Sequence, residues 1–406
     1  MSNEFDITKY TGDENCILES YCLEEVSMSK TSTPKPAGEY AVGTFSYTVY
    51  NDREETMYNA PGTMRSVPVK VYYPAAKASV EGLPKARYLS REMFAVLKKT
   101  YWIPLNYEKA EQDGTNRSEC YEQAPFIDEK RFPLILFNHG YGSFLDANTY
   151  LCIELASRGY FVASIGHPHE ALVTELDDGT TYKMPKGLVS KLYSPVIPSI
   201  FAIMKIMKAK GTNEELYEQF DSMQKKYNRF IAERLPEWKQ DTKAALRYLR
   251  EKYSDRIDFG NGIGVSGHSM GGLTAYSLCE DEPETFTCGI NIDGGLFGDH
   301  DKPMDAPFLQ MNCEPNKNTV TVAFLRNRNV AYHVILRDMQ HIGFTDCKYM
   351  IPLKSMVGKL DPDMEHETVC RIHREFFDTY LKGIKKHPDF ESSDVVRITE
   401  YEPSKM

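Results

Sequence analysis

The chain has 406 residues, with 48 Lys or Arg against 58 Asp or Glu, so its formal net charge is −10. Hydrophobic residues make up 41% and aromatic residues 12%, which predicts a folded globular protein and excludes disorder as its main state. The negative charge and the lack of a basic run argue against nucleic acid as a partner.

Cysteine usage and the first residues bear on the compartment. The nine cysteines form no Cys-x-x-Cys pair, so we expect reduced, mostly buried thiols rather than a disulfide framework or a zinc ribbon. The N-terminus lacks the basic start and apolar core of a secretory signal, and no stretch reaches 18 consecutive apolar residues. We therefore expect a cytoplasmic protein, with export still open if the natural chain begins earlier.

Alternating strand and helix patterns predict one large α/β domain. Residues 1–35 are polar and irregular, which indicates an N-terminal arm or a cover over a sheet edge. The continuous apolar runs favour a mostly parallel sheet of about eight strands with helices on both faces. We expect this domain to span 36–390, followed by a C-terminal tail at 391–406. The strand-like runs lie at 40–50, 67–73, 133–137, 160–165, 262–265, 288–292, 307–311 and 331–336.

Two segments, 74–131 and 166–235, are longer than simple connections. Insertions of this length on a parallel sheet commonly shape a pocket, so we expect them to form a cap. In the second segment, Thr212 and Glu215 make a capping box ahead of a helix. Pro236 lacks an N–H donor and is expected to break or restart that helix.

A nucleophile motif stands between a strand pattern and a helix pattern. The sequence Gly267-His268-Ser269-Met270-Gly271 matches Gly-x-Ser-x-Gly, in the context that a nucleophile elbow requires. Ser269 would occupy a sharp turn with its hydroxyl at the end of the strand, and glycines would allow close backbone approach. The alternative is a plain glycine-rich turn. We favour Ser269 as a catalytic nucleophile in an α/β-hydrolase fold.

A serine nucleophile needs a base, which in this fold follows the serine and the acid along the chain. His341 follows the last predicted parallel strand, where a loop histidine can reach the serine. The other histidines after Ser269 lie among the candidate acids, in a strand, on or near the last helix, or in the tail: His300, His333, His366, His373 and His387. We therefore assign the base to His341.

The acid has several candidates. Asp293 ends the strand that follows the elbow, and it precedes two glycines. Many members of this fold place the acid one strand later, where Glu314 stands. Asp293 is favoured, although its alternative is a turn or helix-capping aspartate. The nearby rivals are Asp299, Asp301 and Asp305.

An oxyanion hole is predicted from an earlier strand. The run at 133–137 ends in Asn138-His139-Gly140-Tyr141-Gly142, a His-Gly-x-Gly turn. In this fold the developing oxyanion is held by a loop N–H of this kind and by the residue after the nucleophile. We expect the backbone N–H groups of Tyr141 and Met270 to fill these roles.

No metal or organic cofactor is indicated. The stretch His167-Pro168-His169-Glu170 follows a strand and suggests metal ligands, but a third ligand elsewhere is not evident. We expect it to line the pocket or fix a loop. The chain also lacks a Walker loop and a Gly-x-Gly-x-x-Gly fingerprint.

The ordered set of motifs resembles the platelet-activating-factor acetylhydrolase family, meaning the plasma and type II serine enzymes among α/β-hydrolases. The likeness runs from about Gly38 to Gly383. It implies that the acid is Asp293 rather than a later residue. The segments that carry it are Gly38–Gly43, Val71–Pro74, Trp102–Pro104, Phe137–Gly142, Gly267–Gly272, Cys288–Asp293 and His341 with Phe344 and Asp346.

The resemblance implies a serine carboxylic ester hydrolase that cleaves short-acyl, phospholipid-like or small esters through an acyl-enzyme. Alternatives are a long-chain lipase, an acyltransferase or peptidase with the same triad, and a non-catalytic binding protein of this fold. Bulky side chains in the insertions would shorten an acyl channel: Tyr88, Phe94, Tyr101, Trp102, Tyr182, Tyr193 and Phe201. The apolar and basic stretch 195–210 indicates a cap helix or, alternatively, a peripheral contact with lipid. The oligomeric state is not indicated.

Overall fold

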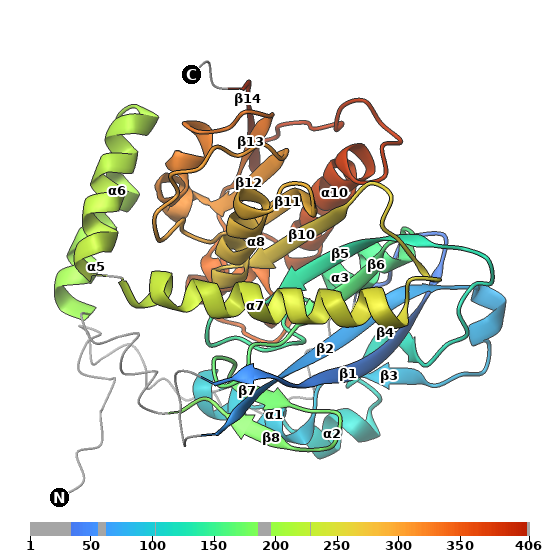
Figure 1. Ribbon diagram of the computed structural model, residues 1–406. Coiled ribbons are helices and arrows are strands. Elements are labelled where there is room, and N and C mark those ends of the chain that lie inside the picture. The colour runs from blue at the N-terminus through green and yellow to red at the C-terminus, as the bar shows by residue number, and fades with distance from the viewer. Residues whose placement is uncertain (1–33, 56–61, 102, 186–195, 228, 404–406) are drawn as a thin grey trace, which may run out of the picture.

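The computed structural model describes residues 34–55, 62–101, 103–185, 196–227 and 229–403 (Figure 1). A twelve-stranded sheet runs through these residues in the order β14-β13-β12-β11-β10-β5-β6-β2-β1-β4-β3, with β9 paired to β5. The strands of the sheet are β1 (Ala41–Glu54), β2 (Met64–Ala75), β3 (Lys85–Arg87), β4 (Arg117–Glu122), β5 (Phe132–Asn138), β6 (Phe161–Ile165), β9 (Ile257–Asp258), β10 (Ile263–His268), β11 (Phe286–Ile292), β12 (Phe308–Cys313), β13 (Ala331–Leu336) and β14 (Val396–Tyr401).

The helices cover both faces of this sheet, as Figure 1 shows. One face packs on α7 (Arg229–Lys252) and α8 (Met270–Asp281), and the other on α3 (Thr149–Ser157) and α10 (Pro362–Tyr380). Strand β5 illustrates burial on both faces of the sheet, because its alternate side chains enter opposite cores. Leu134 packs in the core on one face and Ile135 in the core on the other. Burial on both faces requires the continuous apolar runs that predicted a parallel sheet. The α/β-hydrolase prediction is confirmed.

The strands from β6 through β5, β10, β11 and β12 to β13 are parallel, whereas β2 runs antiparallel to its neighbours β6 and β1. Parallel order places the carboxyl ends of these strands on one edge of the sheet. The turns after β5, β10 and β11 therefore meet there, as in other open α/β sheets. The functional residues predicted from sequence lie at this edge.

Both inserted segments contain secondary structure of their own. In 74–131, strands β3 and β4 lengthen the sheet beyond β1, and the helices are α1 (Arg91–Tyr101) and α2 (Tyr107–Gln112). The segment 166–235 holds the hairpin β7 (Val173–Glu175) and β8 (Thr181–Lys183), then α5 (Val196–Lys208), α6 (Asn213–Tyr227) and the start of α7. The short elements elsewhere are α9 (Lys354–Val357) and the 3-10 turns η2 (Lys77–Val80), η3 (Glu314–Thr319), η4 (Thr321–Phe324), η5 (His341–Phe344) and η6 (Asp346–Tyr349).

Two local expectations about 166–235 have different outcomes. The capping box is confirmed, since the Thr212 N–H donates to Glu215 Oε2 at 2.9 Å and the Glu215 N–H donates to Thr212 Oγ1 at 3.3 Å. The prediction that Pro236 breaks or restarts the helix is wrong, because α7 continues through this residue. Leu235 and Trp238 are buried on either side of the proline, so packing offsets the lost backbone hydrogen bond.

The two ends of the chain also compare differently with expectation. The arm expected at 1–35 lies outside the described residues except for 34 and 35. The C-terminal tail expected at 391–406 is wrong in part, because Val396–Tyr401 forms the strand β14, which pairs antiparallel with β13. Its side chains alternate only weakly in burial, as is usual for an edge strand with one face in water, so no apolar run marked it.

The cysteines and the helices bear on the expected compartment. The seven cysteines in the described part of the chain are free and buried. Among the described residues, no helix combines the length and the apolar character needed to cross a membrane.

Candidate active site

Ser269 stands in the sharp turn between β10 and α8. Its backbone angles are φ 57° and ψ −119°, a conformation that L-residues rarely adopt and that is kept when surrounding packing enforces it. Gly271 lies so close to β5 that a Cβ atom there would fall 2.0 Å from the Asn138 carbonyl oxygen. The glycine of the motif is therefore required by contact between two chain segments. The turn has the geometry expected of a nucleophile elbow.

The structure joins His341 and Asp293, which are 48 residues apart in sequence. His341 Nδ1 lies 2.7 Å from Asp293 Oδ2, which assigns the Nδ1 proton to a bond with the carboxylate. The same carboxylate accepts hydrogen bonds from the Cys313 N–H at 2.9 Å and Asn316 Nδ2 at 2.7 Å. Burial alone would raise the pKa of Asp293, but His341 and the donors outweigh burial and lower it. Asp293 is therefore held as an anion against the imidazole.

The turn that carries Ser269 contacts the backbone of His341 and the residue before Asp293. The Ser269 N–H donates to the carbonyl of Ile292, the residue before Asp293, at 2.8 Å. His268 Nε2 lies 2.9 Å from the His341 carbonyl oxygen, and the two imidazole rings are 4.6 Å apart. The predicted nucleophile, base and acid thus gather at the carboxyl ends of β10, β11 and β13. Sequence reasoning did not foresee the contact of His268 with the backbone of His341.

The rival acids have partners of their own away from His341. Glu314 pairs with Lys317 on the turn η3, next to β12. The other pairs are Asp299 with Lys225 at 3.8 Å, Asp301 with Arg326 at 3.1 Å and Asp305 with Arg328 at 3.8 Å. Among the candidate acids of the sequence analysis, Asp293 is the one that the structure brings to His341.

Other histidines after Ser269 also have separate environments. His300 Nδ1 bonds Glu280 at 2.9 Å, and His373 Nδ1 donates to the Val369 carbonyl at 2.8 Å. His333 is buried within β13. His366 lies beside the Tyr150 ring. His387 falls on the segment after α10.

The turn after β5 lies against the elbow. A Cβ atom on Gly140 would fall 3.1 Å from the Ser269 Cβ atom, so this backbone directly borders the serine. Tyr141 follows, with its ring stacked on Trp238 at 6.2 Å, and Met270 is the first residue of α8. The two backbone positions predicted to form an oxyanion hole are therefore on either side of the same serine.

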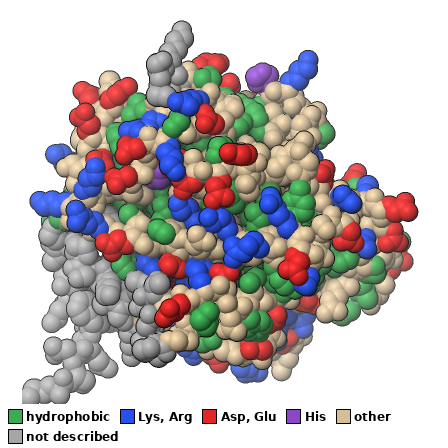
Figure 2. Space-filling model, viewed as in Figure 1, with side chains coloured by type: hydrophobic (Ala, Val, Ile, Leu, Met, Phe, Trp, Pro, Cys, Tyr) green, Lys and Arg blue, Asp and Glu red, His purple; other side chains and the backbone are tan. Residues whose placement is uncertain are grey.

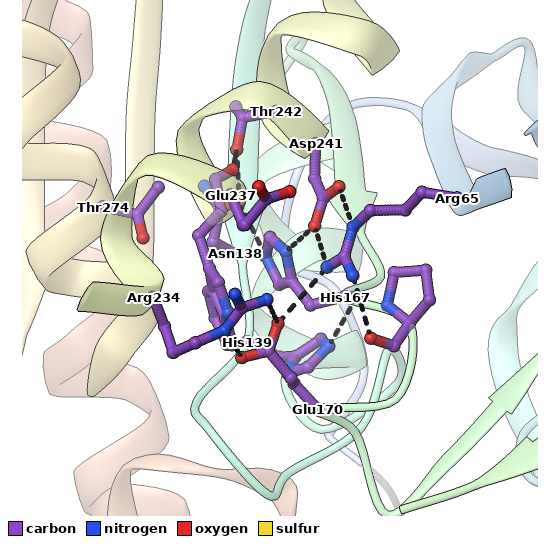
Figure 3. Close-up of polar contacts among 12 residues, drawn as sticks. Arg65, Asn138, His139, His167, Glu170, Arg234, Glu237, Asp241, Thr242 and Thr274 are labelled. Atoms are coloured by element: carbon purple, nitrogen blue, oxygen red, sulfur yellow. Dashed lines mark hydrogen bonds and ion pairs between the residues drawn. The ribbon is translucent and has the colours of Figure 1, made fainter. Parts of the chain in front are cut away.

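Beneath this turn lies a group of charged side chains with His167, which we call the buried ionic cluster: Arg65, Glu170, Arg234 and Asp241 with His167 (Figure 3). The sequence analysis singled out His167 and Glu170 but missed the other three. Arg65 Nε and Nη2 donate to the two Asp241 oxygens, each at 2.7 Å. Burial alone would raise the pKa of Asp241, but Arg65 outweighs it, so the carboxylate stays ionised with its pKa well below the usual value. Arg234 Nε donates to Glu170 Oε1 at 2.8 Å.

This cluster decides the role of the stretch 167–170. His167 bonds Asp241, and Glu170 accepts hydrogen bonds from Arg65 and Arg234. These bonds fix the loop, which is one of the two roles expected for this stretch. The ring of His169 lies 5.0 Å from the Tyr182 ring. Within the part of the chain that the structure describes, no group of three or more His, Cys, Asp or Glu side chains has the arrangement of a metal site.

Comparison with known proteins places the chain in a family. The sequence model of the family described as "Platelet-activating factor acetylhydrolase, isoform II" matches residues 25–382. The chain belongs to this family. It is accordingly a carboxylic ester hydrolase, and the resemblance drawn from the motifs is confirmed.

Individual relatives in this family are distant. A platelet-activating factor acetylhydrolase of Cavia porcellus is 22% identical over 379 residues, which cover 89% of this chain and 81% of the relative. One from Gallus gallus is 27% identical over 215 residues, 50% of this chain and 48% of the relative. A solved ferulic acid esterase from Streptomyces cinnamoneus has a TM-score of 0.67 at 21% identity, covering 90% of this chain and 98% of that one. That likeness shows the shared fold.

Proposed function

We propose that this family member hydrolyses its ester through Ser269, His341 and Asp293. The observation that carries the proposal is the 2.7 Å hydrogen bond between His341 Nδ1 and Asp293 Oδ2, beside the strained turn of Ser269. With Nδ1 protonated and bound to a carboxylate, the other ring nitrogen of His341 is free to act as a base. The side chain of His341 is 41% exposed, so a substrate can reach it.

The reaction follows from these roles. Ser269 Oγ attacks the ester carbonyl while His341 Nε2 takes its proton, and Asp293 stabilises the imidazolium. The N–H groups of Tyr141 and Met270 donate to the oxyanion of the tetrahedral intermediate. When the intermediate collapses, the alcohol leaves with the proton from His341. Water then repeats the sequence on the acyl-enzyme and releases the carboxylic acid.

We further propose a short-acyl ester as substrate, either phospholipid-like or small. The names of the relatives support this class, since platelet-activating factor acetylhydrolases are named for removing an acetyl group. The insertions 74–131 and 166–235 would act as the cap. Some of the bulky residues expected to narrow the acyl channel do not line one: Tyr88 and Phe94 are buried in a packed core, and Phe201 is 69% exposed. Trp102 and Tyr193 lie outside the described residues.

The test is kcat/KM for nitrophenyl esters from acetate to palmitate, with Ser269→Ala as the control. Each methylene that fits an apolar channel contributes up to about 0.8 kcal/mol, roughly fourfold in kcat/KM. We expect a maximum at short acyl chains and a fall of about 10⁶ in kcat for Ser269→Ala. A maximum at long chains would favour a lipase, and residual activity of several per cent in a clean Ser269→Ala preparation would refute the triad.

We also propose peripheral contact with lipid through α5. Ile206 of this helix is buried against α6, whereas Phe201 and Met204 are 69% and 43% exposed. Lys205 and Lys208 are exposed on the same helix, and Figure 2 shows Lys and Arg side chains at the edge of the molecule where α5 and α6 lie. Exposed apolar and basic side chains together favour an anionic interface.

Co-sedimentation with phosphatidylserine vesicles at low salt tests this contact. We expect Phe201→Asp to release the protein from the vesicles, whereas Leu353→Asp, a change at an exposed apolar residue outside α5, does not. The absence of binding by the unaltered protein would leave α5 as a cap helix alone. A cytoplasmic location is likewise a proposal, supported by the free thiols and tested by cell fractionation.

A further inference from the structure

The carbonyl of Gly140 is held by two donors. His139 Nδ1 lies 2.7 Å from this oxygen, and the Ser143 N–H donates to it at 3.0 Å. The carbonyl and the N–H of Tyr141 belong to one planar trans peptide unit, so they point in opposite directions. Fixing the carbonyl therefore fixes the direction of the Tyr141 N–H. Because Gly140 borders Ser269, this peptide is the one that the proposed mechanism uses as an oxyanion donor.

The hydrogen bonds of His139 leave it one protonation state. Its Nδ1 faces the Gly140 carbonyl, which can only accept, so Nδ1 carries the proton. Its Nε2 lies 3.3 Å from the His167 backbone N–H, which can only donate, so Nε2 is bare. His139 is 1% exposed, and burial, aided by His167, lowers its pKa to about 3. The ring is thus a neutral donor throughout the range in which esterases work.

The residue behind His139 is fixed in turn by the buried ionic cluster, as Figure 3 shows. His167 Nδ1 bonds Asp241 Oδ2 at 2.8 Å, and its ring stacks on Trp238 with centroids 3.6 Å apart. Asp241 is held by Arg65 of β2 through the two 2.7 Å bonds. A continuous series of contacts thus runs from the sheet to the peptide beside Ser269.

We propose that His139 is a positioning residue that aims the Tyr141 N–H at the oxyanion, with His167 and Asp241 holding His139 from behind. The inference rests on the proposed function, in which Tyr141 is an oxyanion donor. His139 touches no substrate in this account and acts through the peptide that it orients. Its loss should therefore weaken binding of the transition state more than binding of the ester.

Two variants separate positioning from stability. His139→Leu removes the donor to Gly140, whereas His139→Asn retains an amide N–H near the place of Nδ1. Removing an oxyanion donor costs about 10²–10³ in kcat, and a misdirected donor keeps part of its effect, so we expect a loss of about 10- to 100-fold in His139→Leu. KM should change little, and His139→Asn should recover most of the lost kcat.

A trifluoromethyl ketone supplies a readout that a purely structural role would not move. Its hemiketal oxyanion imitates the transition state, so its Ki should rise by the same factor by which kcat/KM falls. The matched control is His373→Leu, because His373 is also buried with Nδ1 on a backbone carbonyl, that of Val369. We expect kcat and Ki of this folded control to stay within about twofold of the unaltered protein, since the change lies outside the site.

The protonation state can be read without any variant that risks misfolding. Long-range ¹H–¹⁵N spectra of the full chain labelled at histidine should show His139 protonated at Nδ1, bare at Nε2 and not titrating from pH 5 to 9. A proton on Nε2 would overturn the inference, as would normal kcat and Ki in His139→Leu. If Ser269→Ala were active, the proposed function would fail first. If Ser269→Ala is inactive and the His139 variants are normal, only this inference fails.

Discussion

The two sides of Ser269 are built differently. On one side, His341 is 41% exposed and stands on a loop of short 3-10 turns. On the other side, His139 is 1% exposed and rests on the buried ionic cluster. A group that exchanges protons with substrate and water needs access, whereas a group that holds a backbone amide needs a fixed place. The exposure of each histidine therefore matches the role proposed for it.

The loop of His341 is nevertheless anchored behind the base. The Asp346 N–H donates to the Ala147 carbonyl at 2.7 Å, and Asn148 Nδ2 donates to the Phe344 carbonyl at 2.7 Å. The Asp346 side chain accepts from Tyr88 Oη at 3.2 Å. The first two contacts tie the loop to the start of α3, and a buried ion pair between Lys348 and Glu365 ties it to α10. The following changes test whether the two sides differ as described.

The largest effect is expected for Asp293→Asn, on the side of Ser269 where His341 stands. Replacing the carboxylate leaves the shape but removes the charge that orients and stabilises His341, so kcat should fall by roughly 10⁴. Steady-state hydrolysis of nitrophenyl acetate measures this fall. Glu314→Gln is the control, because Glu314 pairs with Lys317 instead. A larger loss in Glu314→Gln than in Asp293→Asn would move the acid to the later strand.

On the buried side, Asp241→Asn should act mainly on stability. It removes a buried carboxylate that accepts two bonds from Arg65 and one from Arg53, and it leaves Arg65 with Glu55 and Glu170. Breaking a buried ion pair in this way typically costs about 3–5 kcal/mol in the free energy of unfolding. Urea unfolding gives the value, and Asp305→Asn, at a half-exposed pair, should cost about 1 kcal/mol or less. Equal losses in the two variants would show that the buried ionic cluster contributes no more to stability than a half-exposed ion pair.

A third effect, expressed per pH unit, concerns the anchor of the His341 loop. Burial raises the pKa of Asp346 to about 8, although Lys348 opposes the shift, whereas an unfolded aspartate titrates near 4. Between these values the folded protein holds the extra proton. The free energy of unfolding should therefore fall as pH rises, by at most about 1.4 kcal/mol per pH unit for this group.

Asp346→Asn should remove that slope. Urea unfolding of both proteins from pH 5 to 8 should give curves that converge at low pH and separate as pH rises, with the variant becoming relatively more stable. Curves that stay parallel would show that Asp346 is ionised in the folded protein.

Much of the site could be predicted from the sequence because its parts are local. The elbow at Ser269 and the glycine turn at Gly140 are set by backbone geometry within a few residues, and His341 follows a recognisable strand. The buried ionic cluster could not be predicted, since Arg65 and Asp241 are 176 residues apart and each is an ordinary charged residue in its own segment. Only the fold brings them together.

The errors in the fold have a related cause. Pro236 breaks a helix by local rules, yet core packing of its neighbours keeps α7 continuous. Strand β14 has no strong apolar alternation because it lies at an edge, so its pairing with β13 decides its conformation. In both cases a tertiary contact outweighs the local signal.

Covalent labelling can identify the nucleophile of this ester hydrolase, which we propose is Ser269. A fluorophosphonate should add one phosphonyl group per chain, and mass spectrometry of the digested protein should place it on Ser269. The label should be absent from Ser269→Ala and slow to form in Asp293→Asn. A label on another residue, or undiminished labelling of Ser269→Ala, would show that Ser269 is not the nucleophile.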